Sequence, residues 1–224
     1  MTVAAVILAA HRGIALRDVE GVPNARRLAD AAWAGGALPI VVVAFDPDGA
    51  VANALAGSVA VLAAPGPQAA GPVGLVCRGI DVARAQIEGT AAALIWPARM
   101  GWVDAETVTS LIEAHGAARG TVFRPAFRGE AGWPALVPTA HLEALRALDP
   151  KLMPGPLLDA LANAVGGRLV ELGDPGTVHD LDTPRAELPA FEGPAEPMSA
   201  HHHEWGSPAA AGPDEPPAPP RTVP

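Results

Sequence analysis

The sequence predicts one α/β domain with a mostly parallel central sheet. Apolar runs of strand length alternate with segments of helical composition from residue 2 to residue 188, the pattern of strands joined by crossover helices. The first run, Val3 to Leu8, has no polar alternation, which is typical of a strand buried on both faces. Ligands of such sheets bind beyond the carboxyl ends of the strands. We therefore expect residues 9–17 to form one wall of any site.

Each predicted element has its own local signal. Gly35 and Gly36 follow the first long helix, where a helix C-terminus is expected. Asp104 and Thr139 each precede a helical segment as candidate N-caps. The predicted strands are 3–8, 39–45, 59–63, 90–96, 121–125 and 168–172, with another inside 129–138 after a glycine turn. The predicted helices are 24–33, 51–55, 73–86, 104–115, 139–148 and 157–165.

Composition narrows the class of protein. A net charge of −9 argues against a general nucleic-acid binder, which needs basic residues to neutralise phosphates. No run approaches the roughly 20 apolar residues that span a bilayer, and the first segment lacks the pattern of a signal peptide. Cys77 is the only cysteine, so no internal disulfide can form. We expect a cytoplasmic protein with no nucleic-acid or membrane partner.

The last part of the chain differs in composition. Residues 191–224 are rich in Pro, Ala and Gly, a composition that cannot bury enough apolar area to offset the entropy of ordering. The prediction is a domain over residues 1–190 and a disordered tail over 191–224. His201 to His203 lie in this tail, either as a metal-binding cluster or as an incidental tract.

Five short motifs occur in a fixed order along the domain. They are Val6 to Gly13 (VILAAHRG), Gly71 to Leu75 (GPVGL), the pair Ala93 to Pro97 and Val103 to Val108, Gly129 to Pro134 (GEAGWP) and Asp180 to Pro184 (DLDTP). Together they resemble the LAAGxGxRMG loop, GxxSL helix start, metal-aspartate region, GxxGHP turn and DIDTP motif of the MobA-like NTP transferases. These nucleotidyltransferases attach a cytidylyl or guanylyl group to molybdenum cofactor. The resemblance covers residues 2–188 and implies a three-layer, Rossmann-like (GT-A-like) nucleotidyltransferase domain.

The resemblance also implies roles for individual residues. The nucleotide-binding loop would comprise Ala9, Ala10, His11, Arg12, Gly13 and Arg17. Gly71 and Gly74 would lie on the base and ribose side, and Gly132, Trp133 and Pro134 on the acceptor side. Asp182 would be a metal ligand, with Arg99 in place of the family's metal aspartate. An active member would use Mg²⁺ with CTP or GTP.

Several of these positions depart from the family pattern. His11 replaces a loop glycine, Ala15 the loop arginine and Arg17 the final glycine, and the segment that carries the phosphate lysine is missing. A side chain at position 11 would crowd a phosphate if the backbone there required positive φ. Gly74 replaces a serine and Trp133 a histidine.

The predicted metal site is altered as well. Arg99 cannot ligate Mg²⁺, which takes hard oxygen donors. It could instead form an ion pair with Asp182 across the cleft.

These departures leave three functions open. The first is a catalytically degenerate member that acts as a binding or accessory module, with a nucleotide, a cofactor or a protein partner in enzyme maturation. The second is an active nucleotidyltransferase that uses arginines in place of the phosphate lysine and a substitute metal ligand such as Asp104. The third is a scaffold whose cleft is filled by Trp133 or His11.

Several individual side chains also have more than one possible role. Asp182 or Thr183 could cap a helix that begins at Pro184. His11 is either a polar residue at the loop mouth or a base. Trp133 is either a stacking platform or a lid, and Trp96 and Trp102 are expected in the core.

Overall fold

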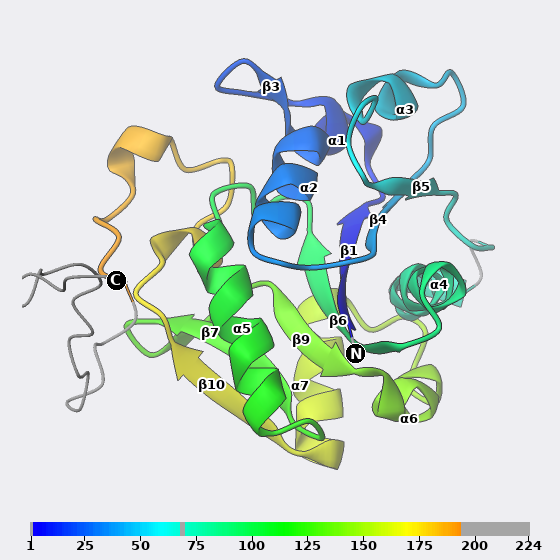
Figure 1. Cartoon of the computed structure of the whole chain (residues 1–224), viewed down its shortest axis with the longest axis vertical. Coiled ribbons are helices and arrows are strands. Elements are labelled where there is room, and N and C mark those ends of the chain that lie inside the picture. The colour runs from blue at the N-terminus through cyan, green and yellow to red at the C-terminus, as the bar shows by residue number, and fades with distance from the viewer. Residues whose placement is uncertain (1, 68–69, 194–224) are drawn as a thin grey trace, which may run out of the picture.

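The structure is a computed structural model that describes residues 2–67 and 70–193. Within this part of the chain, an eight-stranded sheet has the order β10-β7-β9-β6-β1-β4-β5, with β8 paired to β7 (Figure 1). Its strands are β1 (Thr2–Ala9), β4 (Ile40–Ala44), β5 (Val61–Ala63), β6 (Thr90–Pro97), β7 (Val122–Phe127), β8 (Glu130–Ala131), β9 (Ala135–Pro138) and β10 (Gly167–Glu171).

The first strand lies in the middle of the sheet. It runs parallel to β4 on one side and to β6 on the other, so that Ile7 lies opposite both Val42 and Trp96. Strands β4 and β5, and β7 and β10, are also parallel pairs. Strand β9 runs antiparallel to β6 and β7, and β8 runs antiparallel to β7. The mostly parallel sheet expected from the sequence is therefore confirmed.

Helices cover both faces of the sheet. In Figure 1, α2 (Asn24–Ala34) and α5 (Ala105–Ala117) cross in front of it, and α7 (Pro154–Val165) lies behind. Helices α4 (Gly71–Gln86) and α6 (Leu142–Arg146) share a hydrophobic core with α7. The shorter helices are α1 (Arg12–Leu16), α3 (Ala50–Ala54) and the 3-10 turns η2 (Thr139–His141), η3 (Pro175–Thr177) and η4 (Arg185–Glu187).

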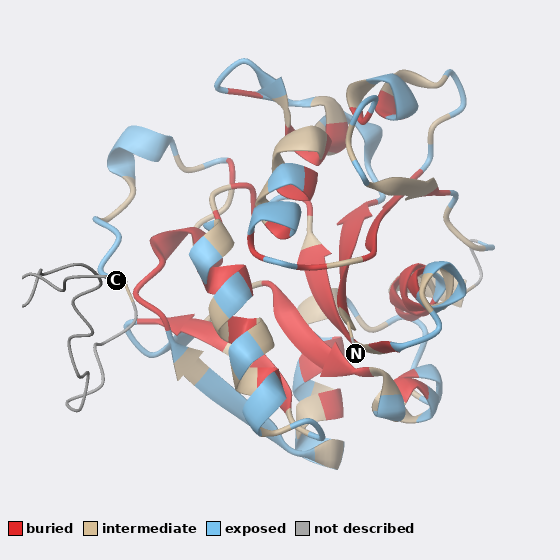
Figure 2. Cartoon of the chain, viewed as in Figure 1, coloured by how far each residue is buried: buried red, intermediate tan, exposed pale blue. Residues whose placement is uncertain are grey.

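A hydrophobic core lies on each face of the sheet, between the sheet and the helices that cover it, so the domain has three layers. Side chains of β1 alternate between the two cores, because successive residues of a strand point to opposite faces. Ile7 belongs to the core under α2 and α5, and Val6 to the core under α4, α6 and α7. Figure 2 shows β1, β6 and β9 almost entirely buried, whereas the edge strand β10 is mostly exposed. Trp96 is fully buried as expected, and its indole N–H donates to the carbonyl of Met100 at 2.9 Å.

Two local elements were not predicted. The ribbon of β2 (Asp18–Val19) and β3 (Val22–Pro23) turns at Glu20 and Gly21, both with positive φ. Two-residue hairpins favour Asn or Asp before Gly, so a Glu-Gly pair gives a weak turn signal. Helix α1 has only five residues, too few for a readable period.

Thr139 was wrongly predicted as a helix N-cap. Its hydroxyl instead donates to the carbonyls of Thr90 and Ala91, at 3.1 and 2.9 Å, which fixes the end of β9 against the start of β6. By contrast, Asp104 caps α5 as predicted, accepting from the Glu106 N–H at 2.9 Å.

The described chain ends beside the carboxyl end of β10. The Glu192 N–H donates to the carbonyl of Gly173 at 2.9 Å, and the Glu192 carboxylate pairs with Arg128. The rest of the predicted disordered tail, residues 194–224 with His201 to His203, lies outside the described residues. Across the described ranges, no helix is both long and apolar enough to cross a membrane.

Candidate functional site

The carboxyl ends of β1 and β6 are tied together at one edge of the sheet. The Ala98 N–H, just after β6, donates to the carbonyl of Leu8 at 3.0 Å. The buried Asn24 side chain, at the start of α2, donates to the carbonyls of Ala98 and Ile14 at 2.7 and 3.1 Å. One amide thus holds the loop after β1 against the loop after β6.

The segment after β1 forms a short helix and not a glycine-rich, phosphate-binding loop. Ala10, His11, Arg12 and Gly13 are exposed, and no residue from 9 to 17 has positive φ. His11 has a φ of −99°, so the backbone there lacks the left-handed conformation that would make its side chain crowd a phosphate. Arg12 points to the neighbouring turn, where it pairs with Asp48 at 2.7 Å.

Two arginines and two aspartates meet in front of this edge, and we call them the Arg17–Arg99 cluster: Arg17, Arg99, Asp180 and Asp182. Arg17 Nη1 lies 3.0 Å from Asp182 Oδ1, and Arg99 Nη2 lies 3.1 Å from Asp182 Oδ2. Arg99 Nη2 also contacts Asp180 Oδ2. The structure therefore contains the ion pair between Arg99 and Asp182 that the sequence suggested.

Backbone contacts position the two aspartates of the cluster. The Leu181 N–H donates to the carbonyl of Arg99 at 2.9 Å, and the Asp182 N–H donates to Asp180 Oδ1 at 2.9 Å. Gly101 lets this turn approach, because a Cβ there would lie 2.6 Å from Leu181 Cδ2.

Asp182 does not cap a helix, which corrects the alternative interpretation from the sequence. The N-cap position of η4 is Pro184, and η4 has no side-chain cap. The Asp182 carboxylate is instead held by the two guanidinium groups of the cluster.

A pocket of about 320 Å³ opens beside the cluster. Trp102 forms part of its wall, so the expectation that this indole belongs to the core is wrong. The Trp102 indole N–H donates to the carbonyl of Thr183 at 3.0 Å, and the guanidinium carbons of Arg27 and Arg185 lie 5.4 and 5.9 Å from the ring centroid. The pocket is lined by Arg17, Asp18, Val19, Glu20, Trp102, Leu181, Asp182, Pro184 and Arg185.

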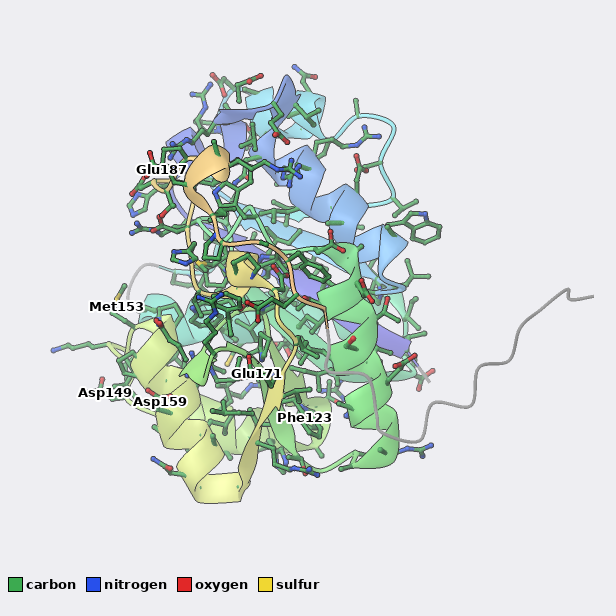
Figure 3. All side chains as sticks on the ribbon, turned by 90° about the vertical axis from the view of Figure 1, so that its left-hand side faces the viewer. Phe123, Asp149, Met153, Asp159, Glu171 and Glu187 are labelled. Carbon is green, nitrogen blue, oxygen red and sulfur yellow. The ribbon has the colours of Figure 1, made fainter. Side chains whose placement is uncertain are left out.

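The wall formed by the C-terminal segment is tied to the β2–β3 ribbon. Figure 3 shows η4, marked by Glu187, at the same end of the molecule as the β2–β3 ribbon, which lies at the top of Figure 1. Arg185 pairs with Glu20, and Arg27 Nη1 lies 3.5 Å from the same carboxylate. Burial lowers the pKa of the Arg27 guanidinium.

The residues at this edge do not fit a Mg²⁺ site. Mg²⁺ needs several oxygen donors free to face it, but both oxygens of Asp182 face guanidinium groups. Asp104, the substitute ligand considered from the sequence, uses its carboxylate to cap α5. Over the part of the chain that the structure describes, no group of three or more His, Cys, Asp or Glu side chains could hold a metal ion.

The other predicted site glycines have packing roles in the structure. Gly71 has a φ of +59°, and a Cβ there would lie 2.0 Å from the carbonyl oxygen of Pro150. A Cβ at Gly74 would lie 2.3 Å from Ala70 Cβ, and one at Gly132 would lie 2.5 Å from the carbonyl oxygen of Thr177. Their roles on the base side and the acceptor side stay predictions.

Trp133 packs into the domain. It is half-buried and contacts both hydrophobic cores. The Trp133 backbone N–H donates to the carbonyl of Thr177 at 2.8 Å, and the Arg124 guanidinium carbon lies 5.5 Å from the indole ring centroid. Of the residues predicted for the site, the cluster brings together Arg17, Arg99 and Asp182.

Sequence reasoning missed three contributors to this site. Asp180 anchors Arg99, and its signal was its position in the Asp-Leu-Asp motif that was used only for Asp182. Glu20 and Arg185 close the far side of the pocket. The Arg185–Glu20 pair joins residues 165 positions apart, and no local sequence pattern predicts such a contact.

A sequence model of the MobA-like NTP transferase domain matches residues 5–164. The chain belongs to the MobA-like NTP transferase family. The resemblance suggested by the five motifs is therefore confirmed, and the match includes β1, β6 and both loops that meet at Asn24.

Solved structures, one of them titled a nucleotidyl transferase, share the fold. A nucleotidyl transferase from Methanothermobacter thermautotrophicus is 22% identical, with 75% of this chain and 85% of that chain covered and a TM-score of 0.59. The manganese complex of Rv0371c from Mycobacterium tuberculosis is 18% identical (81% and 95% covered, TM-score 0.58). CMP:2-keto-3-deoxy-manno-octonic acid synthetase complexed with CTP is 14% identical (83% and 95% covered, TM-score 0.57). At these identities the likeness concerns the fold alone. No curated protein sequence matches the chain significantly.

Proposed function

We propose that this MobA-like domain has lost metal-dependent nucleotidyl transfer and acts as a binding or accessory module in the maturation of a cofactor or of its enzyme. The observation that carries the proposal is the contact of Arg99 with both Asp180 and Asp182. By resemblance, Arg99 stands at the position of the family's metal aspartate. A fixed positive charge there opposes the binding of a divalent cation.

The chemistry of nucleotidyl transfer explains why this exchange matters. A divalent metal holds the triphosphate in line for attack and neutralises the charge that develops on it. Without a pair of free carboxylates, the domain lacks the ligands for that metal. The helical loop after β1 likewise lacks the glycines with positive φ and the lysine that would surround a triphosphate.

Binding remains compatible with the structure. The cluster and the adjoining pocket lie where ligands of open α/β sheets are found, beyond the carboxyl ends of β1 and β6. Relatives of the same fold were solved with CTP and with manganese, which makes a nucleotide a reasonable first ligand to test. Molybdenum cofactor enters the proposal through family membership alone, an argument by analogy.

The loss of the metal site can be tested by restoring a carboxylate. We expect wild-type protein to leave the electron paramagnetic resonance signal of free Mn²⁺ unchanged. Arg99→Asp places a carboxylate beside Asp180 and Asp182 and is expected to bind Mn²⁺, and the double variant Arg99→Asp/Asp182→Asn to lose most of that binding. Arg84→Asp, on the exposed face of α4, makes the same change in net charge and serves as the control.

The alternative is an active nucleotidyltransferase with substitute ligands. Mn²⁺ binding by the wild-type protein that disappears in Asp182→Asn would contradict the proposed loss. Release of pyrophosphate from CTP or GTP by wild-type protein, dependent on Mg²⁺ and on Asp182, would establish the alternative directly.

A further inference from the structure

We propose that Arg17 and Arg99 form a metal-independent site for a phosphate or diphosphate group, and that Asp182 occupies this site when no ligand is bound. The inference rests on the proposed function, because it takes the metal to be absent. It adds the class of ligand and the residues that recognise it. The ligand is a small phosphate or diphosphate ester.

The arrangement of the two guanidinium groups is the first argument. They come from different loops, after α1 and after β6, and converge on a single carboxylate. Each takes one oxygen of Asp182, at 3.0 and 3.1 Å. A phosphate group also presents neighbouring anionic oxygens. Guanidinium groups bind these oxygens in the same planar manner in which they bind the oxygens of a carboxylate. Asp182 is thus held as a phosphate would be held.

The two aspartates differ in how firmly they are held. The Asp182 side chain is 72% exposed, whereas that of Asp180 is 26% exposed. Asp180 also accepts the Asp182 N–H through its other oxygen. Asp180 therefore positions Arg99, while Asp182 makes exposed ion pairs of the kind that water and salt weaken easily. A ligand phosphate can displace Asp182 and leave Arg99 in place.

The pocket gives room for the remainder of the ligand. Arg17 and Asp182 belong both to the cluster and to the pocket wall. A group attached to a phosphate at Arg17 would thus enter the pocket toward Trp102. Its volume of about 320 Å³ is at the lower end for small-molecule sites, which favours a small ester.

Titration calorimetry with inorganic pyrophosphate, in the presence of EDTA, tests the site. We expect wild-type protein to bind pyrophosphate without metal, and Arg99→Gln and Arg17→Gln to bind it more weakly. Asp182→Asn keeps the shape of the side chain and removes the competing charge, so we expect it to tighten binding by about three- to tenfold. At a metal-dependent site, pyrophosphate would not bind in EDTA, and in Mg²⁺ the same substitution would weaken binding because it removes a metal ligand.

A matched control separates this local effect from a change in overall charge. Asp81→Asn breaks the Arg146–Asp81 pair, whose nitrogen and oxygen are 2.7 Å apart and whose side chains are 41% and 43% exposed. It changes the net charge by the same amount, on the outer surface of α4 and α6. We expect its affinity for pyrophosphate to equal that of the wild type.

Three results would overturn the inference. The first is that neither wild-type protein nor Asp182→Asn binds pyrophosphate. The others are that Asp182→Asn and Asp81→Asn bind it with equal affinity, or that Asp182→Asn binds it more weakly than the wild type. The Mn²⁺ experiment distinguishes the two proposals. If wild-type protein does not bind Mn²⁺, and neither wild-type protein nor Asp182→Asn binds pyrophosphate, this inference is contradicted and the proposed loss of the metal site stands. Wild-type protein that binds Mn²⁺ through Asp182 would contradict both.

Discussion

Arg99 and Asp182 form an ion pair at the carboxyl edge of the sheet, with Nη2 of one 3.1 Å from Oδ2 of the other. By resemblance to the family, Asp182 would be a metal ligand and Arg99 would stand at the position of the second acidic ligand. In the proposed function, this ion pair takes the place of a bound divalent cation. The proposal thus separates the fold of the domain from the reaction of its family.

The cluster is expected to contribute little to the stability of the fold. The Arg99 side chain is 62% exposed, and exposed ion pairs contribute about 0–1 kcal/mol. Arg99→Ala should therefore lower the free energy of unfolding by no more than about 1 kcal/mol, measured by urea denaturation. A markedly larger loss would show that Arg99 maintains the fold and would weaken the case for a ligand-binding role.

Gly71 should be intolerant of substitution for steric reasons. Its positive φ and the approach of the Pro150 carbonyl, 2.0 Å from an added Cβ, predict that Gly71→Ala destabilises the domain by roughly 1–3 kcal/mol. Gly155→Ala in α7 is the control, because a Cβ there meets nothing within 4 Å. The control should be neutral or slightly stabilising in thermal unfolding. Equal effects of the two substitutions would contradict the packing role of Gly71.

His115 should make stability depend on pH. It is buried on α5, and among the described residues neither ring nitrogen has a hydrogen-bond partner. Burial together with Arg119 lowers its pKa from 6.5. As pH falls through 6.5, the unfolded chain takes up a proton that the folded protein resists, so the free energy of unfolding decreases.

Urea denaturation at a series of pH values checks this prediction. His115→Leu should reduce the loss in the free energy of unfolding below pH 6.5. The control His11→Gln, which removes an exposed histidine, should leave that loss unchanged. A wild-type curve as flat as that of His115→Leu would contradict the assignment.

Asp174 should be more important for stability than Asp104. The buried Asp174 carboxylate accepts from the Asp104 N–H, the Thr107 hydroxyl and the Gly176 N–H, at 2.9, 2.7 and 2.8 Å. Burial raises the pKa of Asp174. Asp174→Ala leaves these donors without a partner and should cost roughly 2–4 kcal/mol. Asp104→Ala removes one exposed cap and should cost about 1 kcal/mol. Chemical denaturation of both variants compares them, and a reversed order would contradict this account.

The sequence predicted the fold well because its signals are repeated along the chain. Uninterrupted apolar strands such as Val3 to Leu8 and helices ended by Gly35 or capped by Asp104 each have a local cause. The β2–β3 ribbon was missed because its Glu20–Gly21 turn departs from the usual residue preference. Local sequence signals thus predict most helices and strands, but they do not predict turns that are made by unusual residues.

The site was less predictable, since its contacts join distant parts of the chain. The pairing of Arg99 with Asp182 could be suggested only because the family motifs aligned both positions. The roles of Asp180 and Trp102 became visible only once the turn after η3 was seen docked on the loop after β6. Asp182 also looked like a helix cap in sequence, because an Asp before Thr-Pro carries that local signal.

The most direct test of the central claim is a calorimetric titration of the wild-type protein with CTP, in EDTA and in Mg²⁺. If Arg99 has replaced the metal, any affinity for CTP in EDTA should be unchanged or weaker in Mg²⁺, since the cation shields the phosphates from the arginines. Binding that appears only in Mg²⁺, or becomes tenfold tighter with it, would contradict the claim and identify a working metal site.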